Sequence, residues 1–359
     1  MSTPEPAPAG GGRVRRAVVV IAILGLAVAT GIIGWVGFGK VAHAFAVIGW
    51  KGLGGMILTY LPPVALLAGG WWVLNPGAKA RDWLVLYYAR LVRDASGELL
   101  PFSSLGGFVF GARAAILGGV EPAAAISTTA ADVTAEFIGQ LGFTAVGIAL
   151  LAQQPGHEEN QQILTSSVLG LAAGVVAAIL FVFVQRWASA PIERGVARWA
   201  PSALAQTSAV IAQLHDCYRK PGRLTISSVL HLGAWLLGAV GVWIGLHFAG
   251  IDYVKLDNGQ HLPLTLRLIV GLESLVYVVR TITFATPMGL GVIEGGYVVV
   301  GHLFGLPADF CLGLSLIKRL RDIAIGLPAL GAWQVLEGRH AMIGARKTAA
   351  IAQEASGVE

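Results

Sequence analysis

Charged residues are scarce in this chain of 359 residues: they make up 13% of it, whereas apolar residues make up 55%. So few polar side chains cannot cover the surface of a soluble protein of this length, which excludes a soluble globular fold. Cysteine is also rare. Cys217 and Cys311 offer no disulfide framework and no CxxC site. The eight histidines are scattered along the chain, so we expect no metal site and no cofactor.

The net charge of +5 does not indicate a nucleic-acid partner. Binding to a nucleic acid needs basic residues that are gathered on one soluble face, whereas here they lie mainly between apolar runs. In a membrane protein such residues set the orientation of the chain instead.

Six apolar runs are long enough to cross a bilayer core of about 30 Å. They cover residues 17–36, 52–74, 121–152, 163–184, 225–250 and 307–336. The first run has an alternative interpretation, a signal peptide cleaved at Ala42-His43-Ala44. We favour a retained anchor, because the apolar core of a signal peptide is only about 7 to 15 residues long. We expect residues 1–16 to form a disordered cytoplasmic N-terminus.

Two distant stretches look like copies of one unit. In each, a charged helical segment leads into a proline and a glycine-rich apolar segment, and a long apolar run follows. The paired segments are 80–97 with 103–120, and 264–284 with 289–306, with prolines Pro101 and Pro287 between them. Repeated short segments interrupted by Gly and Pro indicate a transporter with its site at the repeat interface.

The positive-inside rule places these segments. Segment 185–224 holds six Lys and Arg against two acidic residues, which predicts a cytoplasmic loop. The N-terminus and the tail, 337–359, can both be cytoplasmic only if each short pair enters and leaves on one side. We therefore predict an all-α polytopic protein with one membrane domain, 17–336. It has six transmembrane helices and two re-entrant hairpins, arranged as an inverted repeat of halves 17–152 and 163–336.

Each hairpin contains two glycines four residues apart. These are Gly107 with Gly111, and Gly291 with Gly295. Such a spacing lets a helix approach its neighbour closely. The alternative is ordinary helix packing in a glycine-rich membrane chain, but the recurrence of the pattern after a proline in both halves favours hairpins.

Ionisable residues inside apolar segments are the candidate site. A charge near the bilayer centre costs at least ~2.5 kcal/mol and faces a cavity or a partner. Asp132 and Glu136 are four residues apart, on one helix face, and we expect Arg113 to be their counter-charge. Glu294 lies in the second hairpin and Arg319 in the last crossing. Either these charges only fix helix packing, or they line a polar path for a lipid headgroup, which is the interpretation we favour.

The segment 285–320 resembles the C-terminal signature of the lysylphosphatidylglycerol synthetase transmembrane family, the flippase-like domain proteins. The matching residues are Pro287, Gly289, Gly291, Glu294, Gly305 and Arg319. Segments 93–120 and 131–143 look more narrowly like the hopanoid-biosynthesis-associated membrane proteins of that family. The resemblance spans about residues 17–336.

The resemblance implies lipid handling in a bacterial inner membrane. It assigns the lipid path to Arg113, Asp132, Glu136, Glu294 and Arg319. Well-understood members also carry a soluble aminoacyl transferase, and because only about twenty residues follow Leu336 we expect no such activity and no catalytic residues here. Three function classes stay open. The first is a flippase, whose lipid is a hopanoid, a related polar lipid or a phospholipid. The second is a membrane-embedded enzyme that acts on isoprenoid lipids, and the third is a scaffold for proteins of hopanoid biosynthesis or transport.

Overall fold

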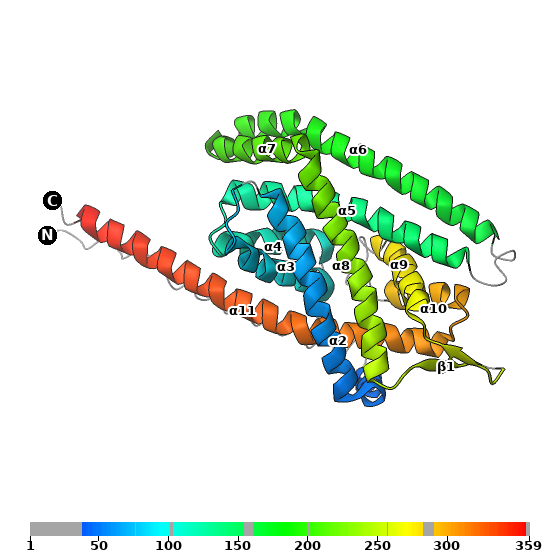
Figure 1. Ribbon diagram of the computed structural model, residues 1–359. Helices are drawn as coiled ribbons and strands as arrows, with labels where there is room; N and C mark the ends of the chain where they lie inside the picture. The colour runs from blue at the N-terminus through cyan, green and yellow to red at the C-terminus, as the bar shows by residue number, and fades with distance from the viewer. Residues whose placement is uncertain are drawn as a thin grey trace.

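The computed structural model describes residues 38–75, 77–100, 103–153, 161–199, 201–256, 258–282 and 291–356, and most of them are helical (Figure 1). The helices are α2 (Phe38–Leu74), α3 (Asp82–Leu99), α4 (Ser103–Leu117), α5 (Pro122–Leu151), α6 (Gln161–Trp199), η1 (Pro201–Ala203), α7 (Leu204–Arg219), α8 (Pro221–Phe248), α9 (Leu266–Ile282), α10 (Val292–Leu303) and α11 (Ala308–Ser356). A two-stranded antiparallel sheet, β1 (Tyr253–Lys255) and β2 (His261–Pro263), joins α8 to α9. The sequence did not predict this sheet.

Four of the described helices are long and apolar enough to cross a membrane. They are Gly49–Leu74 within α2, Pro122–Leu151, Val168–Arg198 within α6, and Pro221–Phe248. Each overlaps one of the six predicted crossings, but α6 continues past the predicted end at Val184 and makes residues 185–199 of the predicted loop helical. The first predicted crossing, 17–36, lies outside the described residues, as do Pro101, Pro287 and the N-terminal segment 1–16.

The last predicted crossing, 307–336, is not among these four spans. It forms the first part of α11, where Lys318, Arg319, Arg321 and Asp322 interrupt the apolar run. The helix also continues through Leu336 to Ser356, so this segment and most of the expected tail form one helix. The count of six crossings is therefore not established by the described helices.

The four shorter segments form two pairs of short helices at the predicted positions. The helices α3 and α4 have 18 and 15 residues, and α9 and α10 have 17 and 12. At about 1.5 Å per residue all four are shorter than a bilayer core of about 30 Å. Glu121, which follows the first pair of short helices, is the N-cap residue of α5. Its carboxylate accepts hydrogen bonds from the backbone N–H groups of Ala123 and Ala124, at 2.9 and 2.6 Å.

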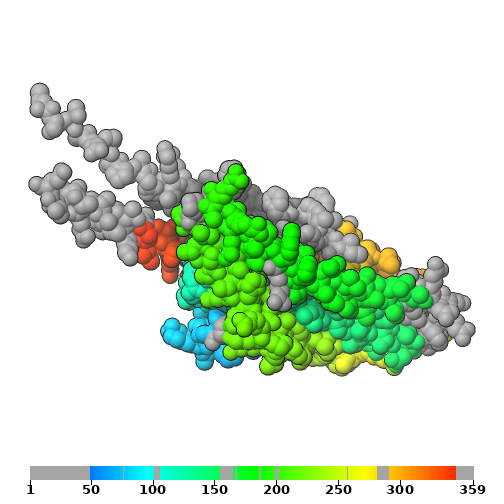
Figure 2. Space-filling view, turned by 90° about the horizontal axis from the view of Figure 1, so that it is seen from above, coloured from blue at the N-terminus to red at the C-terminus, as the bar shows by residue number. Residues whose placement is uncertain are grey.

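The helices α2 and α8 pack along each other, α3 packs on α4, and α5 lies against α8 and α9 (Figure 1). Helix α6 runs beside α5 at the outside of the molecule and covers one face together with α7 (Figure 2). Only 6% of the apolar window of α6 is buried in the protein, against 39 to 44% for the other three spans. Most of α6 therefore depends on the membrane for its packing.

The predicted hairpin glycines serve different purposes. A Cβ on Gly107 would lie 2.8 Å from the carbonyl oxygen of Arg93, and one on Gly111 would lie 2.8 Å from the Arg93 side chain. These two glycines thus let α4 approach α3 closely, as predicted. For the second pair the expectation was wrong: among the described residues no atom lies within 4 Å of a Cβ on Gly291 or Gly295, whereas the adjacent Gly296 packs on Val279. Gly291 has a φ of 79° and caps α10.

We expect Gly107→Ala to destabilise the protein by about 1–3 kcal/mol, because the new methyl group would push against backbone and separate α3 from α4. The measurement is the thermal unfolding midpoint of the purified protein in detergent. Gly295→Ala is the matched control, and it should leave the midpoint unchanged or raise it, since alanine favours a helix. Equal midpoints for the two variants would contradict the close α3–α4 contact.

Candidate functional site

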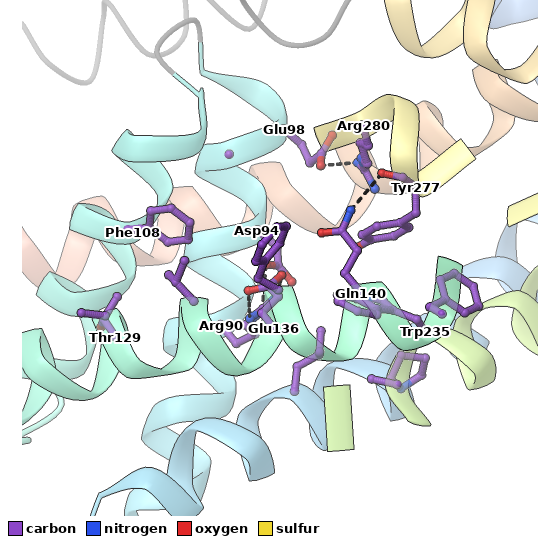
Figure 3. A pocket seen from close by; sticks show the side chains of 18 of the residues that line it. Arg90, Asp94, Glu98, Phe108, Thr129, Glu136, Gln140, Trp235, Tyr277 and Arg280 are labelled. Carbon is purple, nitrogen blue, oxygen red and sulfur yellow. Dashed lines mark hydrogen bonds and ion pairs between the residues drawn. The ribbon is translucent and has the colours of Figure 1, made fainter. Parts of the chain in front are cut away.

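A cavity of about 1370 Å³ lies among the helices, with walls of two characters. Aromatic and aliphatic side chains, such as Phe108, Phe181 and Trp235, form much of its lining. The other part of the wall is charged, and its ionisable residues are Arg90, Asp94, Glu98, Arg113, Glu136, Glu273, Arg280, Lys318, Arg321 and Asp322. The cavity therefore combines an apolar surface with a charged one. Figure 3 shows the charged side chains between α3, α5 and α9.

Two arginines of α3 hold two carboxylates of α5 at the centre of the site. Arg90 donates to both oxygens of Glu136, at 3.2 and 3.0 Å, and its Nη1 lies 3.4 Å from Asp132 Oδ2. Arg93 donates to Asp132 Oδ2 at 2.6 Å and to Glu136. Asp132, Arg90 and Arg93 are buried, whereas Glu136 is half-buried and lines the cavity. We name these four residues the central cluster.

Local helix geometry explains the central cluster. Arg90 and Arg93 are three residues apart on α3, and Asp132 and Glu136 are four apart on α5, so each pair lies on one helix face. The two faces meet, and each arginine contacts both acids. Arg90 Nε is also 2.9 Å from Asp94 Oδ1, one turn further along α3. A fork-shaped guanidinium satisfies such crowded acceptors better than a lysine would.

Further ion pairs extend the charged wall. Arg280 of α9 pairs with Glu98 of α3, and these two residues lie at one end of the group drawn in Figure 3. Lys318 of α11 donates to Glu273 of α9 and, at 2.5 Å, to the hydroxyl of Tyr297 of α10. The Arg280–Glu98 pair thus connects the two pairs of short helices directly.

The structure brings some predicted site residues together and separates others. Asp132 and Glu136 share one cluster, as their spacing predicted. Arg113 is not their counter-charge; it donates instead to both oxygens of Glu337 in α11, at 2.9 and 2.6 Å. Glu294 and Arg319 form an ion pair at 2.6 Å, and neither lines the large cavity.

Sequence reasoning missed Arg90, Arg93 and His231. A signal for the arginines was present, because an i,i+3 pair of arginines in a segment with Asp94 has the spacing to grip an i,i+4 pair of acids. The sequence does not say which helix packs on α5, and Arg113 was chosen for its position inside the apolar hairpin. His231 was a lone histidine in a long apolar run, and it lies 3.4 Å from Asp132.

The central cluster does not fit a metal ion. Asp132, Glu136 and His231 bring ligand-type atoms within 4.8 Å of one another. However, the guanidinium groups of Arg90 and Arg93 already bind both carboxylates and supply two positive charges there. A divalent cation would have to displace them against their repulsion.

Residues 22–329 match the family of the lysylphosphatidylglycerol synthase transmembrane region, so the chain belongs to this family. Neither a curated protein nor a solved structure matches it. Membership, together with the four apolar spans, identifies a multi-pass membrane protein of a lipid-related family. It does not single out a lipid.

We expect Arg93→Gln to lower the free energy of unfolding by about 3–5 kcal/mol, because Asp132 would keep a buried charge with one arginine fewer. Unfolding in detergent, followed by circular dichroism, measures the effect. Lys220→Gln is the control, since Lys220 forms an exposed ion pair with Asp216 at 2.6 Å, and the loss of such a pair costs less than about 1 kcal/mol. If Arg93→Gln were as stable as Lys220→Gln, the central cluster would not be the buried network described above.

Proposed function

We propose that this member of the lysylphosphatidylglycerol synthase transmembrane family moves a polar lipid between the two leaflets of a bacterial inner membrane. The observation that carries the proposal is the cavity, which has a charged wall for a headgroup and apolar walls for the attached hydrocarbon. Its volume of about 1370 Å³ exceeds the range of about 300–1,000 Å³ of pockets for small molecules. A lipid headgroup with the start of its tails is an occupant of suitable size and character.

The charged wall lowers the barrier that a headgroup meets in hydrocarbon. Polar groups that leave water without new partners lose several kcal/mol of free energy. Carboxylates and guanidinium groups along α3, α5, α9 and α11 replace part of that hydration. The half-exposed pair of Arg280 and Glu98, with side-chain exposures of 27 and 32%, is open enough to exchange one partner for a headgroup.

In this proposal the two pairs of short helices are re-entrant hairpins, one in each half of an inverted repeat. Their short lengths and the Arg280–Glu98 pair between α9 and α3 support it. The basic segment 185–224 lies in the cytoplasm, as do both chain ends. Backbone that stops within a bilayer is tolerated where it lines such a cavity.

The proposed cargo is a hopanoid or a related polar lipid, and a phospholipid is the alternative. The hopanoid is proposed because of the sequence resemblance to hopanoid-associated proteins, and the phospholipid because of family membership. Mass spectrometry of the lipids that remain bound through purification in detergent separates them: enriched hopanoids support the first, and enriched phospholipids the second.

Transport accounts for the site better than catalysis does. Among the described residues, the charged groups of the cavity wall are engaged in ion pairs, such as Lys318 with Glu273 and Arg321 with Asp322. A hydrolase or transferase site needs instead a nucleophile aligned with its base. The remaining alternative, a scaffold for lipid-modifying proteins, does not require the cavity at all, and filling the cavity distinguishes the two.

We expect Gly238→Trp to slow lipid movement at least about tenfold, because Gly238 lines the cavity, has no atom within 4 Å of a new Cβ, and would carry a ring into the open space. Gly170→Trp on α6 is the control: it also has open space but does not line the cavity, so it should behave as the wild type.

The protein is reconstituted in phosphatidylcholine vesicles that contain one of two probes. One is a fluorescent phospholipid quenched from outside, and the other is a vicinal-diol hopanoid cleaved by external periodate.

A wild-type protein that moves neither probe faster than empty vesicles would overturn the transport proposal. Equal rates for Gly238→Trp and the wild type would show that lipid does not pass through this cavity, in agreement with a scaffold. The two probes also separate the narrow substrate from the broad one.

We expect Arg280→Gln to reduce the transport rate by about tenfold or more, the kinetic equivalent of losing one charge-assisted hydrogen bond of about 1.5–3 kcal/mol. The same vesicle assay measures it. Arg267→Gln is the matched control on the same helix, because Arg267 is exposed, donates to Gln153 at 2.5 Å and lies outside the cavity wall. Equal loss in both variants would mean that α9 itself, and not the charge in the cavity, is what the substitution disturbs.

A further inference from the structure

A histidine and an aspartate face each other in the interior beside the central cluster. His231 of α8 and Asp132 of α5 have no exposed surface, and their Nε2 and Oδ1 atoms are 3.4 Å apart. Neither atom has a hydrogen-bond partner among the described residues. Buried polar atoms without a partner are rare, and each one calls for a physical explanation.

The hydrogen bond at the other ring nitrogen determines which tautomer is present. His231 Nδ1 lies 2.8 Å from the carbonyl oxygen of Ser227. A carbonyl oxygen only accepts, so Nδ1 must carry a hydrogen and donate it. In a neutral imidazole, Nε2 is then a bare lone pair. It points at a carboxylate oxygen, and two acceptors that face each other at this distance repel unless a proton lies between them.

The charges around His231 lead to the same conclusion. Arg90 and Arg93 of α3 face the site, opposite Asp132 and Glu136 of α5 and Asp94. With a neutral histidine, these two arginines and three acids leave one net negative charge in and beside the protein interior. One proton on His231 makes the site neutral.

Uncharged residues of other described helices pack around the His231 ring. From α2 the contact is Gly70, where a Cβ would lie 2.9 Å from the ring, so the imidazole fits only because the residue is glycine. Within α8, the ring of Trp235 lies 6.2 Å away. Tyr277 of α9 packs on Trp235, with ring centroids 4.8 Å apart.

We propose that Asp132 and His231 form a buried proton-binding site that is coupled to the charged wall of the cavity. The lone pair of His231 Nε2 accepts a proton that enters from hydronium in the cavity by way of Glu136, and the new N–H donates to Asp132 Oδ1. One O–H bond of the hydronium breaks, one N–H bond forms, and a water molecule is left in the cavity. Coupling follows from Arg90, which is shared between buried Asp132 and cavity-lining Glu136: once His231 neutralises Asp132, Arg90 is held less firmly and is freer to bind a headgroup.

The proton site itself is tested without any transport measurement. Protein labelled with ¹⁵N-histidine, in detergent, is titrated while the ring-nitrogen resonances are followed. We expect one histidine to have both ring nitrogens protonated at neutral pH and to lose that signal in His231→Gln. His247→Gln is the matched control, because His247 forms an exposed pair with Asp252 at 2.5 Å, and its removal should leave the signal in place.

A second variant tests whether the protonated signal belongs to the histidine beside Asp132. Asp132→Asn should convert the same histidine to the neutral form, because the amide can donate to Nε2 and no carboxylate remains to hold the proton. If His231 is neutral throughout about pH 5–8, the range in which histidine ordinarily titrates, the proton site does not exist and the proposal is overturned. The wild-type titration and His231→Gln suffice for this decision if Asp132→Asn fails to fold.

The coupling rests on the proposed function and has its own readout. Vesicles that contain the wild type or a variant are given a pH gradient, and the movement of both lipid probes is measured with and without it. We expect the wild type and His247→Gln to respond to the gradient at least about fivefold, and His231→Gln to move lipid at one rate in both conditions.

The outcomes separate the two proposals. A wild type that moves lipid at the same rate with and without the gradient overturns the coupling, while the function stands. A wild type that moves no lipid at all overturns the proposed function and the coupling, and the histidine titration still decides whether Asp132 and His231 bind a proton.

Discussion

A charge that has left water is stable only beside a partner of opposite charge with good hydrogen-bond geometry, and this constraint organises the interior of the protein. Asp132 needs Arg90 and Arg93, and so α3 must face α5 in one register, with the two arginine side chains reaching across to the acids. That register brings α4 along, because Gly107 and Gly111 allow it to lie tightly on α3. Replacing such a network by apolar residues is often neutral for stability, so stability alone does not account for its presence here.

The same pairing gives every charge that faces the cavity a protein partner, such as Glu98 for Arg280 and Glu273 for Lys318. In the proposed transport, a headgroup would therefore compete with existing ion pairs instead of meeting bare charges. Its binding would be an exchange of partners, with a small net change in free energy. A site through which cargo passes needs this property, because tight binding would hold the cargo inside.

The sequence predicted the helices and the acids well and predicted their partners poorly. Apolar run length located four crossings, and the i,i+4 spacing placed Asp132 and Glu136 on one face, because both features are local. The counter-charge was wrong: Arg113 pairs with Glu337, more than two hundred residues away, and only the packed fold shows which of several arginines faces α5. The glycine pattern failed at Gly295 for the same reason, since one step along a helix turns a residue by about 100° and puts Gly296 against α9 instead.

Helix α6 relates the cavity to the membrane around it. Ala177, Phe181 and Gln185 of this helix line the cavity, yet little of its apolar part packs on protein. The apolar run 163–184 of this helix is about 33 Å long, which matches a hydrocarbon thickness of about 30 Å. Lipid tails, and not other helices, therefore pack on most of its surface. The position of α6, and with it the width of the cavity beside it, is set jointly by the polypeptide and by the lipid that surrounds it.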